Sequence, residues 1–195
     1  MITEYWYPAD STPDDGYWNN SDSGTTNFHL YIDDIQGSPD DDTSCIWCVS
    51  AAVLKKVTHN TDNSTKQIPA GATDIKLTLN WRGDINGSDE LTDAKYTAGI
   101  LSGATQDTGD IITGPAGEWY SQSKEYTTDP ATSAAWTVAN ANAVKLLSFS
   151  GSRAQQLARL TQVYLKVEYN EAVSSRPEKT RQVIDLSRYL KKIRD

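Results

Sequence analysis

Apolar and polar residues alternate along much of this chain with a period of two, which is the pattern of a strand that buries one face. The clearest runs are residues 75–82 and 162–169, and a third run places Phe28, Leu30 and Ile32 on one face. Polar turn clusters rich in Gly, Pro, Asn and Asp separate these runs. Further strands are expected at residues 45–57, 96–101, 119–126 and 144–149, of which the first is longer and more buried.

Seven or more short strands joined by polar turns predict an all-β fold, either an antiparallel β-sandwich or a barrel. The alternation stops near Asn170, so we expect one domain over residues 1–170. The chain has 195 residues, which is long enough for a single core. We see no internal repeat of fixed period.

The last 25 residues have a different pattern. Residues 171–177 indicate a linker, because Pro177 disfavours helix at the residue before it. Beyond it, the spacing of Val183, Leu186, Leu190 and Ile193 predicts a short amphipathic helix in a basic arm. The arm also carries Arg188, Lys191, Lys192 and Arg194. Because so short a helix is marginal alone in water, we expect these apolar and basic residues to bind a partner.

Charge is unevenly distributed. The net charge is −8, and residues 1–54 contain ten acids without a Lys or Arg. Residues 171–195 reverse the sign, with seven basic and four acidic side chains. An acidic body repels phosphate, so we expect no direct binding of nucleic acid. No apolar run approaches 18 residues, and no basic region followed by an apolar one opens the sequence, so we expect neither membrane insertion nor export.

Cys45 and Cys48 have the spacing of a redox or zinc motif. In a strand, however, side chains three residues apart point to opposite faces, and a zinc site needs about four ligands. We therefore expect buried thiols, with a local disulfide or a metal site as the alternatives. This interpretation leaves the fold independent of both metal and disulfide.

Acidic residues cluster at 33–34 and 40–42, where a calcium site is the alternative to simple solvation. The sequence shows no nucleophile elbow, no phosphate-cradling loop and no histidine metal motif. We therefore expect no catalytic residues, no metal and no cofactor.

Aromatic residues are frequent, with six Trp and ten Tyr. Trp81 and Trp119 fall on alternating runs and are expected in the core. Trp6, Tyr7, Tyr17 and Trp18 lie among turns near the N-terminus. If these four side chains are exposed, they form either a protein interface, with Trp6 and Trp18 as its anchors, or a platform on which sugars stack. We favour their burial by the sandwich or by a partner chain.

The order of aromatic and acidic residues at 4–8, 16–18, 25–34 and 39–42, with residues 135–138 and 159–169, resembles a group of tailed-bacteriophage virion proteins. Those proteins are built as jelly-roll-like β-sandwiches, and the resemblance covers about residues 4–170. It implies a structural role in a virion without placing the chain on the head, the neck or the tail.

Together these observations lead to one main expectation and one alternative. The chain is expected to be a non-enzymatic virion component, such as a capsid decoration or a neck or tail accessory protein. It would be made in the host cytoplasm and contact other virion chains, with copies of itself among them. The alternative is a β-sandwich module that binds carbohydrate or adheres to the host.

The arm provides the first testable prediction. Deletion of residues 178–195 should leave the body folded but abolish its incorporation into particles, since the apolar stripe and its basic neighbours are expected to be the anchor. Mass spectrometry of purified particles measures incorporation. Particles that carry the folded, truncated protein at the normal level would contradict the anchoring role.

Overall fold

Two 14-residue strands, β6 (Thr73–Asn86) and β14 (Leu157–Asn170), run antiparallel at the centre of the larger sheet. The computed structural model describes residues 1–14, 17–33, 43–48, 53–62, 66–86, 94–113, 117–152 and 157–171. Within these ranges the larger sheet has six strands in the order β10-β6-β14-β4-β3, and β1 also pairs with β14. Its other members are β1 (Ile2–Trp6), β3 (Trp18–Asn20), β4 (Ile46–Cys48) and β10 (Tyr120–Tyr126).

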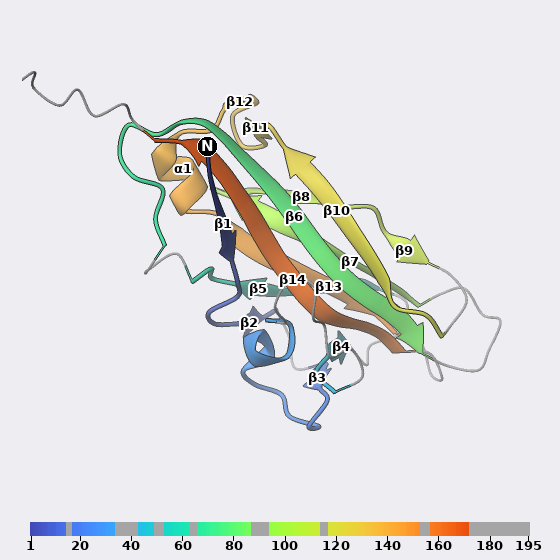
Figure 1. Cartoon of the computed structure of the whole chain (residues 1–195). Helices are drawn as coiled ribbons and strands as arrows, with labels where there is room; N and C mark the ends of the chain where they lie inside the picture. Colours follow the sequence, from blue (N-terminus) through green and yellow to red (C-terminus); the bar gives the residue numbers. More distant parts are fainter. Residues whose placement is uncertain are drawn as a thin grey trace, which may run out of the picture.

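A second sheet lies behind the first (Figure 1), and we call it the smaller sheet because its six strands contain fewer residues. Its strand order is β2-β5-β13-β7-β8, and β9 pairs with β7. The strands are β2 (Thr12–Pro13), β5 (Lys55–His59), β7 (Lys95–Ser102), β8 (Thr105–Thr108), β9 (Ile112–Thr113) and β13 (Lys145–Gly151). From β4 to β7 each strand lies in the other sheet from the strand before it, and the chain changes sheets again between β13 and β14. Such crossings are typical of jelly-roll-like sandwiches. The antiparallel β-sandwich predicted from the sequence is confirmed.

Three short elements complete the described chain. A 3-10 helix, η1 (Phe28–Tyr31), follows β3. The small pair β11 (Thr128–Asp129) and β12 (Ala134–Ala135) precedes the helix α1 (Val138–Asn142) at one end of the sandwich (Figure 1). Asp129 fixes this end, because its buried carboxylate accepts hydrogen bonds from Ser102, Asn140 and the Ala131 N–H. None of the helices in the described ranges is long and apolar enough to span a membrane.

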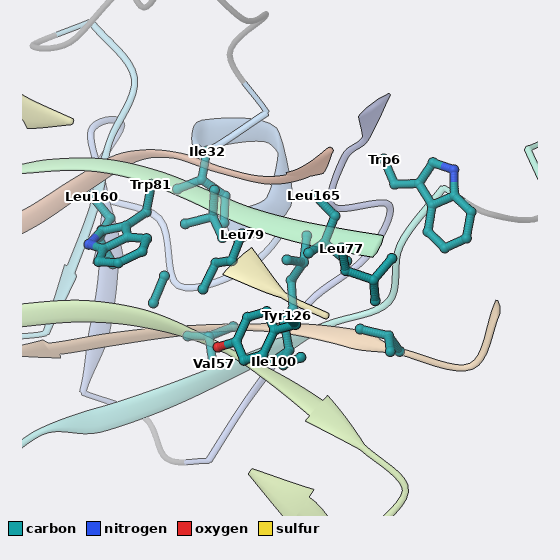
Figure 2. Close-up of a cluster of buried hydrophobic side chains, with 14 of the residues drawn as sticks. Trp6, Ile32, Val57, Leu77, Leu79, Trp81, Ile100, Tyr126, Leu160 and Leu165 are labelled. Carbon is teal, nitrogen blue, oxygen red and sulfur yellow. The ribbon is translucent and has the colours of Figure 1, made fainter. Parts of the chain in front are cut away.

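The core fills the space between the two sheets (Figure 2). The period-two runs provide it: Ile75, Leu77, Leu79 and Trp81 on β6 all point inward, as predicted. The matching positions on β14 bury Val163, Leu165, Val167 and Tyr169. Cys45 and Cys48 are both buried thiols, also as predicted. Burial of these apolar side chains against the other sheet holds the two sheets together through the hydrophobic effect.

Two predicted strands are wrong. Residues 45–57 are not one strand: β4 pairs with β14 in the larger sheet, whereas β5 pairs with β13 in the smaller one. The run at 28–32 is not a strand but contains η1, which ends at Tyr31, and Asn27 before it has a positive φ of 55°. Phe28 and Ile32 are buried four residues apart on one side of this turn, while Leu30 is 54% exposed. Such i, i+4 spacing also satisfies a period of two, so the pattern could not separate the two structures.

The predicted arm and most of the acidic cluster lie outside the described residues. β14 ends at Asn170, and residues 172–195 are not described. The arm residues therefore stay a prediction: Val183, Leu186, Arg188, Leu190, Lys191, Lys192, Ile193 and Arg194. Of the acidic cluster, only Asp33 lies within the described ranges, so the calcium alternative is equally untested.

His59 on β5 gives the fold a pH dependence. Burial lowers the pKa of its imidazole from 6.5 to about 3, and this outweighs the backbone and carboxylate of Asp10, which raise it. The unfolded chain therefore takes up a proton below pH 6.5 while the folded chain does not, so stability falls as the pH drops from 6.5 towards 3. The loss is about 1.4 kcal/mol per pH unit within this window.

We predict that His59→Gln flattens this dependence. Urea unfolding at pH 7 and at pH 5 should show a loss of about 2 kcal/mol in the native chain that is largely absent in the variant. Ser148→Ala is the matched control, because it removes the hydroxyl that lies 2.9 Å from His59 Nε2 but leaves the imidazole in place. An equal slope in the native chain and in His59→Gln would contradict this account.

Candidate functional site

The outward-pointing side chains of β6 and β14 form a polar surface on the larger sheet. Alternation on β6 turns Thr78, Asn80 and Arg82 away from the core, and all three are half-buried. The register places Tyr164 beside Asn80, and Gln162 beside Arg82. In Figure 1 the described strands β1, β14, β6 and β10 present this side to the viewer, and no labelled element lies over it. We call this surface the outer face.

Three tyrosines gather on the outer face near the middle of β14. Tyr5 on β1 packs edge-on against Tyr164, with ring centroids 6.0 Å apart, and the Tyr7 ring lies 5.6 Å from Tyr164. Lys66 holds this tyrosine cluster in place, since its ammonium lies 5.6 Å from the Tyr7 ring centre and donates to the Tyr5 carbonyl. The rings of Tyr5 and Tyr7 stay partly exposed, whereas Tyr164 beneath them is 6% exposed.

Near the start of β14, the outer face contains two tryptophans around an ion pair. Arg159 on β14 donates from two nitrogens to the Asp84 carboxylate of β6. Its guanidinium lies 4.8 Å from the ring centre of Trp119, and Trp47 is its neighbour on β4. Both tryptophans are half-buried. A bidentate pair of this kind fixes the geometry of the side chains around it.

Amide and carboxylate groups lie beside and between these aromatic groups. Asn80 pairs with Tyr164, Gln162 lies between Tyr164 and Arg159 on β14, and Asp33 forms a bridge beside Gln162. At about 3.3 Å per residue, the distance along β14 from Arg159 to Tyr164 is roughly 16 Å. Burial, followed by the nearby Tyr7 and Tyr5, raises the pKa of Tyr164, so its hydroxyl keeps its proton and can donate.

The exposed N-terminal platform, which was the alternative to burial, does not form around Trp6 and Trp18. Trp6 and Trp18 are 0% and 1% exposed, and both belong to the core of their own chain, so neither side chain is available to a partner or a sugar. Their burial is the outcome that the sequence favoured. Tyr7 joins the tyrosine cluster instead, and Tyr17, which is 51% exposed, lies near Lys55.

Sequence reasoning placed Trp119 in the core, which is wrong. Trp81 is buried there as predicted, but Trp119 precedes β10 and packs on the outer face against Arg159. Tyr5, Tyr164 and Trp47 were not singled out at all. The polar positions of the period-two runs were the available signal, because they mark the face turned away from the core.

One arrangement inside the sandwich resembles a nucleophile and its base. His59 Nε2 lies 2.9 Å from Ser148 Oγ, but both residues are fully buried between the sheets, where a substrate has no access. The described part of the chain contains no group of three or more His, Cys, Asp or Glu that could hold a metal ion. The outer face is therefore the candidate site.

No family model matches the sequence, and no curated protein matches it either. Among solved structures, one of TmCBM61 in complex with beta-1,4-galactotriose is similar at 11% identity and a TM-score of 0.39, covering 80% of this chain and 85% of that chain. A second, described as CBM4 structure and function, is similar at 20% identity and a TM-score of 0.37, covering 68% of this chain and 90% of the other.

Proposed function

We propose that this chain is a non-catalytic module that binds an extended carbohydrate across its outer face. The observation that carries the proposal is the tyrosine cluster, where Tyr5, Tyr7 and Tyr164 gather on a surface that the core does not need. Aromatic rings combine a flat apolar face with a polar tip, which suits the C–H faces and hydroxyls of a sugar ring. Carboxamides such as those of Asn80 and Gln162 both donate and accept hydrogen bonds, as sugar hydroxyls do.

The shape of the outer face favours a chain of sugars over a single one. Its aromatic groups stand at two places along β14, with the tyrosine cluster near the middle and Trp119 near the start, and Gln162 lies between them. A ligand that reaches both groups must extend along β14 for roughly 16 Å. The proposed ligand is therefore a segment of a polysaccharide or a long oligosaccharide.

Substitution of the tyrosines tests this proposal. Tyr5→Ala and Tyr7→Ala should each weaken binding to a recognised polysaccharide at least tenfold, or about 1.4 kcal/mol, while leaving the melting temperature nearly unchanged because both rings lie outside the core. Affinity electrophoresis against a panel of soluble polysaccharides, followed by calorimetry, measures the effect. Tyr120→Ala is the matched control, since this tyrosine is 45% exposed and hydrogen bonds to Glu118 away from the cluster.

Two results would contradict the carbohydrate proposal. One is a native chain that binds no member of a broad panel. The other is a set of tyrosine variants that bind as well as the native chain and the Tyr120→Ala control.

A second candidate function is a structural role in a tailed-phage virion, as a capsid decoration or a neck or tail accessory protein. The resemblance of residues 4–170 to such virion proteins favours it. The basic arm would contact other virion proteins, and a carbohydrate-binding face would be compatible with a place on the particle surface.

The particle itself separates the two functions. Particles carrying Tyr5→Ala should assemble normally and lose adsorption to polysaccharide if the outer face binds sugar, whereas lost assembly would favour the structural role. Trp6→Ala is unsuitable for this comparison, because emptying a fully buried site costs about 3–5 kcal/mol of stability. Absence of the chain from purified particles would contradict the virion role.

A further inference from the structure

We propose that the outer face selects uncharged polysaccharides and rejects acidic ones. This inference rests on the proposed carbohydrate-binding function and specifies the class of ligand. The whole chain has a net charge of −8, and the charges on the outer face decide which ligands it can hold.

Basic side chains do not outnumber acidic ones on the described outer face and beside the tyrosine cluster. The basic residues are Lys66, Lys76, Arg82, Arg159 and Lys166, and the acidic residues are Asp33, Asp62, Asp74, Asp84, Glu125 and Glu168. The face therefore has no net positive charge. This alone does not decide the ligand, since an anion could still be held by one exposed cation.

Two of the basic side chains, Lys76 and Lys166, are paired with the same acid. Lys166 Nζ lies 2.9 Å from a Glu168 oxygen, and Lys76 Nζ lies 3.1 Å from the other. Lys76 also pairs with Glu125 at 3.2 Å. Glu168 is 5% exposed and central to this group, and the hydrogen bond from Lys166 lowers its pKa more than burial raises it. Glu168 therefore stays ionised and holds both ammonium groups.

The remaining cations are also held. Arg159 is bound to Asp84 on two atoms, and Lys66 pairs with Asp62 at 3.0 Å. Arg82 donates to the Trp119 carbonyl and to Ser121 Oγ. An incoming carboxylate or sulfate must compete with the acids that hold Lys66, Lys76, Lys166 and Arg159, and it must also approach a protein of net negative charge. The groups suited to a ligand are then hydroxyls, carboxamides and aromatic rings, which recognise a neutral sugar.

Direct comparison of polysaccharides tests this inference with the full chain. Uncharged glucans, xylans and galactans should include a ligand, and its dissociation constant should change less than twofold between about 0.05 and 0.5 M salt, because no net charge is neutralised on binding. Polygalacturonate and sulfated polysaccharides should bind at least tenfold more weakly. Stronger binding of an acidic polysaccharide would overturn the inference yet support the carbohydrate proposal, and a chain that binds nothing would overturn both.

Glu168→Gln tests the physical reason for the selectivity. The substitution leaves Lys166 without its carboxylate and Lys76 with Glu125 alone, so binding to polygalacturonate should rise at least fivefold and be lost in high salt. Glu125→Gln is the matched control, because it changes the charge of the face by the same unit while Glu168 still holds Lys76 and Lys166, so it should gain less affinity than Glu168→Gln. Ser123→Lys adds a cation at an exposed position of the same face without touching the ion pairs, and it should gain the same binding. If neither Glu168→Gln nor Ser123→Lys gains affinity for polygalacturonate, the inference is overturned.

Discussion

The antiparallel pairing of β6 with β14 is the constraint on which the rest of the structure depends. It joins twelve residue pairs between two 14-residue strands and fixes both faces of the larger sheet at once. One face supplies the apolar side chains that bury against β13 and β7 (Figure 2), and the other supplies the polar side chains of the outer face. Because successive side chains point to opposite sides, a slip of one residue would exchange core and site.

The second edge of β14 explains why the N-terminal segment matters to the site. β1 pairs with its C-terminal half, the backbone of Ile32 and Asp33 meets its middle, and β4 pairs with its beginning. This order brings Tyr5 beside Tyr164 and Trp47 beside Arg159. The inward neighbour of Tyr5 is Trp6, whose full burial anchors the strand that carries the cluster. The core and the proposed binding surface are therefore built on the same strands, from alternating residues.

Sequence reasoning recovered the strands whose alternation is long, such as residues 75–82 and 162–169, because a repeated period of two has no good helical equivalent. It failed at 28–32, where the spacing of Phe28 and Ile32 fits a turn of helix as well as a strand. It also failed at 45–57, where the chain changes sheets. The site was beyond reach for another reason. Tyr5 and Tyr164 lie far apart in sequence, and only the register of β1 on β14 joins them.

The central claim is that a carbohydrate lies along the outer face, and chemical-shift mapping by NMR tests it most directly. Addition of a bound oligosaccharide should shift the amide signals of Tyr5, Asn80 and Tyr164, because they lie at the surface where the ligand would rest. The signals of β5, β13 and β7, on the opposite side of the core, should stay in place. Shifts confined to the smaller sheet, or saturating ligand with no shift on β6 and β14, would contradict the account.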